Sequence, residues 1–376
     1  MPPPEPQGQS ESVDFSRFDG LKNTVKPERL SDRDLARAIN IDLDDDGQAH
    51  RRRGYTQVAS GNYHSLFTSE TGVCYVVCNG QLSILNPDYS LVGLRSGIAC
   101  DPSTGSTGLR YTQVGNEIYF TSATNAGIIS EAQRTVVPWG PAQDIWLSPV
   151  VNPTTNLPAI RGRLLGSPPL ATTLAYFNGR LYLGQGKTLW ATEPFAYGLV
   201  DKTKNYVMFE GDITMIAEVT DGIYVGTTEG VWFLAGPAYP LKRSRVMDSP
   251  VIPGSMTYVP GELANPPQVG TNPDTEVMIS VMFMTTRGVC VGLDGGKAYN
   301  LTESKFFFPV AKRSSAMFRR QDGMNQYIAV NDSEGQPVNG ARGVDFADAE
   351  IIRGSAQWVE VSDGGVGYDN IQAGDQ

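Results

Sequence analysis

The alternation of hydrophobic and polar positions changes near residue 40. Before that point, Ser31 precedes the segment DRDLARAI, where apolar residues recur at helical spacing and aspartates occupy the first turn. This pattern predicts a short helix. From Ile39 onward apolar and polar residues alternate as in strands, and Asp46-Gly47 is a strong hairpin turn signal.

One phrase recurs along the chain from about residue 60. It has a three-residue apolar core such as Leu181-Tyr182-Leu183, then a turn containing glycine, then a second strand such as the one holding Leu189-Trp190. The phrase occurs at 71–87, 116–130, 178–194, 221–237 and 286–302. The repeats are roughly 40 to 65 residues apart, which brackets the length of a four-stranded propeller blade. We therefore predict an all-β fold, a β-propeller; a β-sandwich or two stacked barrels are the alternatives.

The composition of the chain divides it into four parts. Residues 1–30 are predicted to form a flexible or extended N-terminal arm, because the first residues are rich in Pro, Gln, Ser and Glu. Residues 31–58 hold the short helix and a charged β-hairpin, and 59–330 hold the propeller. Residues 331–376 form a C-terminal segment, either a strand that closes the propeller or a flexible tail.

Two long insertions interrupt the predicted propeller. The segments near 140–170 and 236–276 are rich in proline and show no regular pattern. They are too long for simple connections between strands. We expect them to form irregular loops that project from the propeller and contact partners.

Charge and composition narrow the classes of function. The 376 residues carry a net charge of -10, which argues against a protein whose main role is to grip DNA or RNA. It does not exclude a surface past which DNA slides. No apolar run reaches the roughly 20 residues of a membrane span, and the N-terminus lacks a signal-peptide pattern, so we expect folding in a reducing cytoplasm without membrane insertion. The four cysteines are expected to be buried thiols.

The segment NIDLDDDGQAHRRRGY (40–55) combines aspartates with an arginine run. Asp42, Asp44 and Asp46 followed by Gly47 match the first half of a calcium-binding EF-hand loop. The twelfth position of that loop, which should supply a glutamate, is Arg53. We therefore predict no metal site, and a hairpin whose opposite charges attract across the strands. A protein contact through the arginines is the second interpretation.

No catalytic constellation is evident in the sequence. The two histidines, His50 and His64, have no nucleophile elbow beside them, and VGLDGGKAYN (291–300) opens a strand where a phosphate-binding loop would open a helix. We predict that the chain is not an enzyme and has no catalytic residue, cofactor or metal. A propeller glycoside hydrolase using Glu193 or Asp221 is the most distant alternative.

Aromatic residues leave a different function open. Propellers present loop side chains on one face, where aromatic rings stack on sugars. Candidates for such stacking, whose simpler interpretation is blade core, are Tyr182, Trp190, Trp232 and Tyr299. A receptor- or carbohydrate-binding propeller is therefore an alternative function.

The order of motifs from Phe18 to about Ala329 resembles the propeller-type structural proteins of bacteriophage tails, the nozzle or hub proteins of short-tailed phages. The resemblance rests on the entry hairpin of 40–55 and on the phrases NGRLY and DGIYVGT. The matching hairpin positions are Asn40, Ile41, Asp42, Gly47, Arg53, Gly54 and Tyr55. One departure is that Arg53 directly precedes Gly54, where the family pattern has Arg-Pro-Gly.

This resemblance implies a virion structural protein of the tail, made in the cytoplasm of the host bacterium. It implies a homo-oligomeric ring of about six copies that binds a tail adaptor or connector and other tail proteins. DNA would pass transiently through its exit channel during ejection, without specific binding. The candidate interface residues are Arg51, Arg52, Arg53, Asp44, Asp45, Asp46, Lys242 and Arg243.

Overall fold

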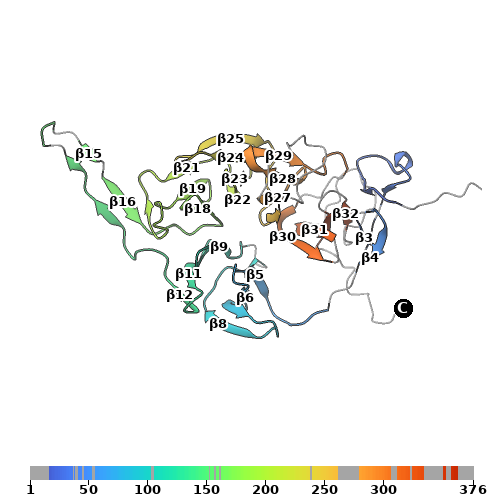
Figure 1. Ribbon diagram of the computed structural model, residues 1–376, viewed down its shortest axis with the longest axis horizontal. Coiled ribbons are helices and arrows are strands. Elements are labelled where there is room, and N and C mark those ends of the chain that lie inside the picture. Colours follow the sequence, from blue (N-terminus) through green and yellow to red (C-terminus); the bar gives the residue numbers. More distant parts are fainter. Residues whose placement is uncertain are drawn as a thin grey trace, which may run out of the picture.

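Strands make up almost all of the regular structure of the chain. The computed structural model describes residues 17–36, 38, 41–44, 46–52, 56–102, 106–151, 153–155, 158–160, 162–237, 239–260, 279–305, 311–321, 324–333, 350–352 and 357–362. These residues form six four-stranded sheets arranged around a central axis (Figure 1), together with smaller sheets of two or three strands. The predicted all-β propeller is confirmed, and its described part has six blades.

We number the blades in chain order. Blade 1 contains β5 (Tyr63–Thr68), β6 (Cys74–Cys78), β7 (Gln81–Leu85) and β8 (Leu91–Arg95). Blade 2 contains β9 (Arg110–Val114), β10 (Glu117–Thr121), β11 (Ala126–Ser130) and β12 (Thr135–Val137). Blade 3 contains β17 (Thr173–Phe177), β18 (Arg180–Gln185), β19 (Thr188–Ala191) and β21 (Tyr206–Met208). Blade 4 contains β22 (Ile213–Val219), β23 (Gly222–Thr227), β24 (Val231–Ala235) and β25 (Lys242–Met247).

The last two blades complete the ring. Blade 5 contains β26 (Thr257–Pro260), β27 (Ile279–Thr285), β28 (Gly288–Leu293) and β29 (Lys297–Asn300), with the 3-10 turn η3 (Asp294–Gly296) before its last strand. Blade 6 contains β30 (Ala311–Gln321), β31 (Met324–Ser333), β33 (Gln357–Ser362) and β32 (Glu350–Ile352), in that order across the sheet. The C-terminal segment thus supplies two strands to blade 6, with β33 parallel to β31.

The repeated phrase of the sequence corresponds to hairpins within the blades. In blades 1 to 4 it is the central pair of strands, and in blade 5 it is the pair β28 and β29. Tyr182 and Tyr224, in the middle of their phrases, are almost completely buried. Their neighbours on both sides are buried too, because another blade covers each face of a central strand. This double burial explains the continuous apolar triplets.

The hydrophobic core is divided among the blade interfaces. Separate clusters join blades 1 and 2, 2 and 3, 3 and 4, and 4 and 5, and a further cluster joins blades 5 and 6 to the N-terminal segment. Blade 6 reaches the segment that links blades 1 and 2 through the Arg313 guanidinium, which donates a hydrogen bond to the Pro102 carbonyl oxygen.

The N-terminal segment packs against blades 5 and 6 at the far end from blade 3 (Figure 1). It contains β1 (Gly20–Leu21), η1 (Pro27–Arg29), β2 (Asp34–Leu35), β3 (Ile41–Leu43) and β4 (Ala49–Arg51). Leu21 and Ala38 lie in the same cluster as Tyr327 of blade 6, and the Asn23 amide donates to the Lys305 carbonyl oxygen at 3.0 Å. The part of the predicted arm around Leu21 and Asn23 is therefore held by the propeller, and Pro27–Arg29 form an exposed 3-10 turn.

The helix predicted after Ser31 is wrong where the structure describes it. Asp34 and Leu35 form β2, which pairs in parallel with β1. The Ser31 hydroxyl accepts a hydrogen bond from the Arg33 amide, and the Asp34 carboxylate accepts one from the Ser31 amide, which makes a tight turn of this segment. Pairing with β1 outweighed the local helical spacing, because tertiary contacts commonly override the weak helix propensity of a short segment. The predicted hairpin of β3 and β4 is present, with Asp42 opposite His50.

Neither insertion is an irregular loop throughout. Most of 140–170 is a β-ribbon of β13 (Ile145–Leu147), β14 (Val150–Val151), β15 (Pro158–Ile160) and β16 (Arg163–Gly166). Within 236–276, β25 and β26 are ordinary blade strands, and 261–278 lies outside the described residues. The proline-rich composition misled the prediction because proline occurs beside strands and at their edges.

Candidate assembly interface

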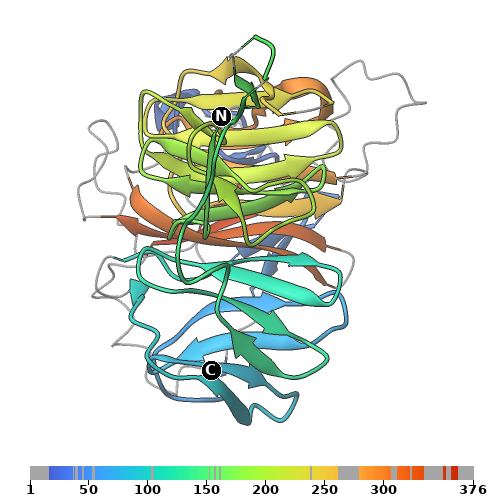
Figure 2. The same cartoon turned by 90° about the vertical axis from the view of Figure 1, so that its left-hand side faces the viewer.

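The ribbon 144–166, called the arm below, projects from the side of the propeller next to blade 3 (Figure 1). Figure 2 views the molecule from the side on which the arm projects. Ile145 pairs with Leu165 and Trp146 with Leu164, and the pairing continues toward the tip through β14 and β15. A two-stranded ribbon of this kind is marginally stable in water by itself.

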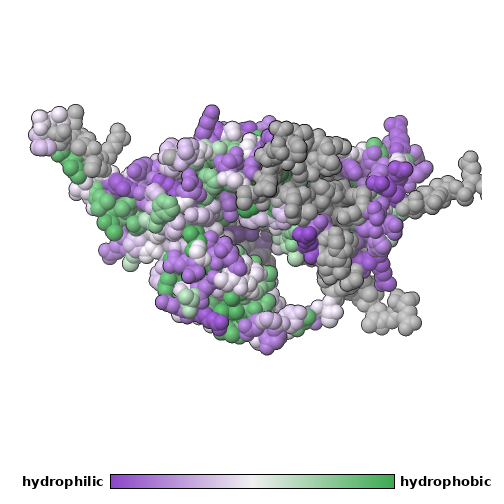
Figure 3. Space-filling model, in the orientation of Figure 1, coloured by the Kyte–Doolittle hydropathy of each residue, from purple (hydrophilic) through white to green (hydrophobic). Residues whose placement is uncertain are grey.

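The arm exposes an unusual concentration of large apolar side chains. Trp146 is 58% exposed and Val150 is 55% exposed. Ile145, Leu147 and Val151 are also exposed. Successive residues of a strand point to opposite faces, so this run leaves both faces of the ribbon uncovered. Figure 3 shows apolar surface along the arm and at its root. Contiguous exposed apolar surface of this type marks interaction sites.

A buried ion-pair network fixes the root of the arm to the propeller. Strand β16 pairs with β20 (Val200–Asp201), and Arg163 Nε donates to the Asp201 carboxylate at 2.8 Å. A second nitrogen of Arg163 lies 2.6 Å from Glu193 Oε1. Asp201 is completely buried, which pushes its pKa up, but hydrogen bonds from Thr203 and Arg163 outweigh burial and lower the pKa of its carboxyl. The carboxylate is therefore held in its charged form.

Aromatic rings also hold the root of the arm where the chain enters it, before β13. Trp139 precedes the arm, and its indole Nε1 donates to the Tyr197 carbonyl oxygen at 2.8 Å. The rings of Trp139 and Tyr119 are 5.4 Å apart, and Tyr119 also contacts Tyr197 edge to face. Gly140 and Gly198 pass so closely that a Cβ on Gly140 would lie 2.6 Å from the Gly198 carbonyl oxygen. The arm is thus rigidly held at its base and uncovered beyond it.

The outer edge strand of blade 4 carries the predicted contact residues Lys242 and Arg243, and both are exposed. The Arg243 guanidinium lies 4.9 Å from the ring centroid of Trp232 and donates to the Met208 carbonyl oxygen at 2.9 Å. Arg245 stacks on the same ring at 5.5 Å. This edge therefore presents a positively charged surface held in place by cation–π contacts.

The charged hairpin is mostly neutralised within the chain. Arg52 is buried and its Nε lies 3.2 Å from Asp42, so its charge is paired within the chain. Asp44 accepts from the Gln48 amide and contacts His50 at 2.9 Å, and the hydrogen bond with His50 lowers the pKa of Asp44. Arg51 and Asp46 remain exposed, whereas Asp45 and Arg53 lie outside the described residues. Within the described part of the chain, no cluster of acidic, histidine and cysteine side chains is arranged to hold a metal ion.

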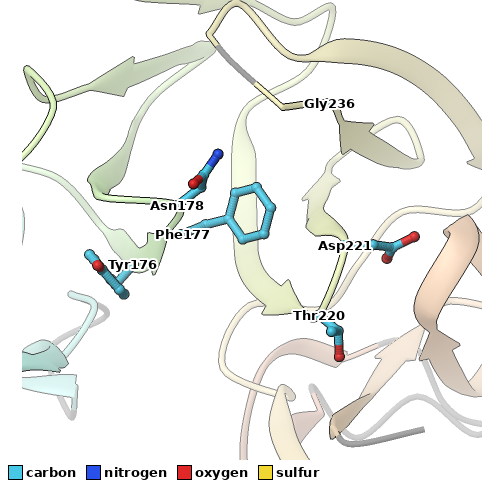
Figure 4. A pocket seen from close by; sticks show the side chains of 6 residues that line it. All are labelled: Tyr176, Phe177, Asn178, Thr220, Asp221 and Gly236. Carbon is cyan, nitrogen blue, oxygen red and sulfur yellow. The ribbon is translucent and has the colours of Figure 1, made fainter. Parts of the chain in front are cut away.

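The carboxylates considered for hydrolysis have structural partners. Asp221 accepts from the Gly295 amide at 2.9 Å, and Glu193 accepts from the Asn205 amide group at 2.6 Å beside Arg163. Asp221 borders an open groove of about 450 Å³ between blades 3 and 4. Figure 4 shows its carboxylate turned away from Phe177, which lies across the groove. These contacts connect blades, and Asp294 likewise accepts from the Thr220 amide at 2.9 Å. Among the described residues that line the groove, Asp221 is the one carboxylate.

The candidate sugar-stacking aromatics are engaged in the blades. Tyr182 is 1% exposed, which places it in the core. Trp190 packs against Tyr206 with ring centroids 5.4 Å apart, and Trp232 lies beneath the arginines of β25. All four cysteines are free thiols, and Cys78, Cys100 and Cys290 are buried as predicted, whereas Cys74, the first residue of β6, is only half-buried. The described residues include no helix with the length and hydrophobicity of a membrane span.

Comparisons with known proteins give little information beyond the arrangement of the sheets described above. No protein-family model and no curated protein matches the chain. The WD40 domain of Neurospora crassa Pan2 is similar at a TM-score of 0.40 and 9% identity over 81% of each chain. The N-terminal domain of Nup159 is similar at 0.41 and 6% identity, over 72% of this chain and 73% of that one.

A third similar structure is PorZ, a bacterial surface component of the type-IX secretion system of Porphyromonas gingivalis. Its TM-score is 0.38 at 14% identity, over 77% of this chain, which spans 34% of the PorZ chain. These likenesses are too weak to carry an argument, so the propeller assignment rests on the six sheets themselves.

Replacing Arg163 by alanine is expected to destabilise the root of the arm by about 2 kcal/mol, because a buried carboxylate loses its main cation. Lys202→Ala, which removes an exposed contact of 2.7 Å to Asp144, is the control and should cost less than about 1 kcal/mol. Urea denaturation measures the loss of unfolding free energy in both variants.

The stabilisation by the Arg163–Asp201 ion pair depends on pH. The folded pKa of Asp201 lies below its ordinary 3.8, so this stabilisation is present above pH 3.8 and is lost as the pH falls through the folded pKa. An Arg163 effect that persists unchanged at lower pH would contradict this explanation.

Proposed function

We propose that this chain is a structural subunit of a bacteriophage tail, which assembles into a ring around the DNA exit channel and attaches to a tail adaptor or tube. The observation that supports this most is the arm, a rigidly rooted ribbon with uncovered apolar residues on both faces. Closed rings are built from contacts between two different patches of neighbouring copies. In our proposal the arm of one copy docks on the next copy.

The charge of the chain is compatible with this role. A net charge of -10 repels the DNA backbone over about 8 Å at physiological salt, so a passing genome would not be retained. The positive charge on the edge strand β25 is small compared with the net negative charge of the chain. Its arginines are suited to binding carboxylates of a neighbouring protein. The location in a virion tail and the absence of membrane insertion are parts of the same proposal.

The proposal is tested with the purified full-length chain and with virions. Sedimentation analysis should show a species several times heavier than the 40.7 kDa chain, and mass spectrometry of purified virions should detect the protein. Negative-stain images should show closed rings. A monomer at all concentrations that is missing from virions and binds host surface glycans would instead establish the receptor-binding alternative.

A further inference from the structure

The innermost strands of the propeller enclose a cavity of about 260 Å³. Its walls include Tyr111 of blade 2 and Glu218 of blade 4, which are not neighbouring blades, together with residues of blades 1, 3 and 5. The cavity is therefore part of the central channel. Glu218 accepts a hydrogen bond from the Tyr258 hydroxyl across the boundary between blades 4 and 5.

Side chains in this channel are accessible and yet deep inside the molecule. Tyr258 keeps 37% of its surface exposed, but burial raises the pKa of its phenol well above the ordinary value. A side chain that lines a narrow hollow surrounded by protein can keep exposed surface and still have its pKa shifted by burial. The same combination occurs for Arg110, which is partly exposed while desolvation lowers the pKa of its guanidinium.

Arg110 reaches across this channel. It is the first residue of β9 in blade 2, and a Cβ placed on Gly254 would lie 3.3 Å from its Nη2 atom. Gly254 precedes β26 of blade 5, and blades 2 and 5 stand opposite each other in a ring of six. The guanidinium therefore lies within the channel and not in an interface between neighbouring blades.

Arg110 has no counter-charge. It makes no hydrogen bond or ion pair with any described residue, and no carboxylate contributes to its pKa. By contrast, Arg52, Arg163 and Arg245 each contact a carboxylate. Arg110 keeps part of its surface open to the channel, so its guanidinium is accessible to an anion that enters from solvent. A bound oxyanion would supply the charge partner that the described residues do not.

Two hydroxyl groups at the same end of the channel also lack partners. Thr107 Oγ1 and Thr214 Oγ1 are buried and have no hydrogen-bond partner among the described residues. Thr107 lies three residues before the start of β9, and Thr214 lies at the irregularity in pairing between Ile213 and Met215 at the start of β22. The innermost strands all run in one direction, because each of these blades starts at its innermost strand and has four antiparallel strands. The beginnings of β9 and β22 therefore share one end of the channel.

We propose that this end of the central channel binds a small oxyanion, with Arg110 as the charged group and the hydroxyls of Thr107 and Thr214 as further donors. A planar guanidinium donates two parallel hydrogen bonds to phosphate or carboxylate oxygens. The shared chemistry is an oxyanion, supplied either as free phosphate or as a carboxylate group. The site is separate from the arm and does not depend on ring assembly.

The test uses the full-length chain in a chloride buffer of constant ionic strength, titrated separately with inorganic phosphate and with acetate. Calorimetry should show saturable binding of at least one of them, and the midpoint of thermal unfolding should rise with its concentration. Saturation by phosphate alone would identify a phosphate site, and saturation by acetate identifies a site for carboxylates.

Variants separate binding from a merely structural role. Arg110→Met should weaken binding by about a hundredfold, while its unfolding midpoint without the anion stays equal to or above that of the unmodified chain. Lys187→Met, which removes an exposed cation elsewhere, should leave binding unchanged. Thr214→Val should weaken it about fivefold. If Arg110→Met does not fold, Arg110→Lys should fold and bind about tenfold more weakly.

The inference is overturned if neither anion binds saturably. It is equally overturned if Arg110→Met responds to the anion as the unmodified chain does, or if the folded Arg110→Lys variant binds with unchanged affinity.

Discussion

Replacing Trp146 and Val150 together by aspartate is expected to abolish self-association of the chain and to leave the propeller folded. Both side chains are more than half exposed in the single chain, so their loss removes little packing within it. In the proposed ring they are covered by the next copy, and burial of a large apolar side chain contributes roughly 1.5 to 3 kcal/mol. Losing two of them, with charges in their place, should weaken association by a hundredfold or more, a figure on the order expected from 3 kcal/mol.

Sedimentation of the double variant across a range of concentrations measures this effect, and circular dichroism confirms that the fold is retained. Val92→Asp is a matched control, because Val92 is also exposed at 46% but lies on β8 of blade 1, away from the arm. The control should assemble normally. Equal association of the double variant and the unmodified chain would show that the arm is not the contact between copies.

Replacing Gly254 by alanine is expected to destabilise the propeller by about 3 kcal/mol or more, through strain at the boundary of blades 5 and 6. Gly254 has a φ of +84°, which disfavours any side chain, and its added Cβ would lie 1.9 Å from the Ser314 carbonyl oxygen. That oxygen belongs to the backbone of β30, whose position is fixed by its pairing with β31. The Ser314 amide also donates to the Pro253 carbonyl oxygen at 2.7 Å, so the two segments cannot separate cheaply.

Gly72→Ala is the control that separates the cost of the left-handed backbone from the cost of the close approach between Gly254 and Ser314. Gly72 has nearly the same φ, +83°, but nothing lies within 4 Å of its added Cβ. Its substitution should cost only about 1 kcal/mol, the ordinary penalty of a left-handed conformation. Denaturant unfolding of both variants gives the difference. Similar losses for the two glycines would mean that blade 6 shifts to accommodate the methyl group.

Much of the fold could be predicted from the sequence because it is encoded locally. A central strand covered on both faces needs consecutive apolar residues, and the turn that follows needs glycine, so each blade repeats a recognisable phrase. Blade 6 lacks the phrase, since its neighbours β31 and β33 are far apart in the chain and pair in parallel. The charged hairpin was also predictable, because Asp46-Gly47 and alternating residues act over short range.

Tertiary structure alone decided the remaining features. The helical spacing after Ser31 gave way to a parallel pairing of β2 with β1, which local propensity does not register. The proline-rich insertion became an arm because its strands pair with each other and with β20, and Arg163 joins carboxylates about thirty residues or more away in sequence. Arg110 carries no local motif at all. By itself the sequence determined the repeating hairpins of a propeller and its acidic charge, whereas the six blades became visible only in the structure. The position of the arm strands outside the ring depends on contacts between segments far apart in the chain. The same is true of the side chains that line the channel. A single sequence carries no local signal for such contacts.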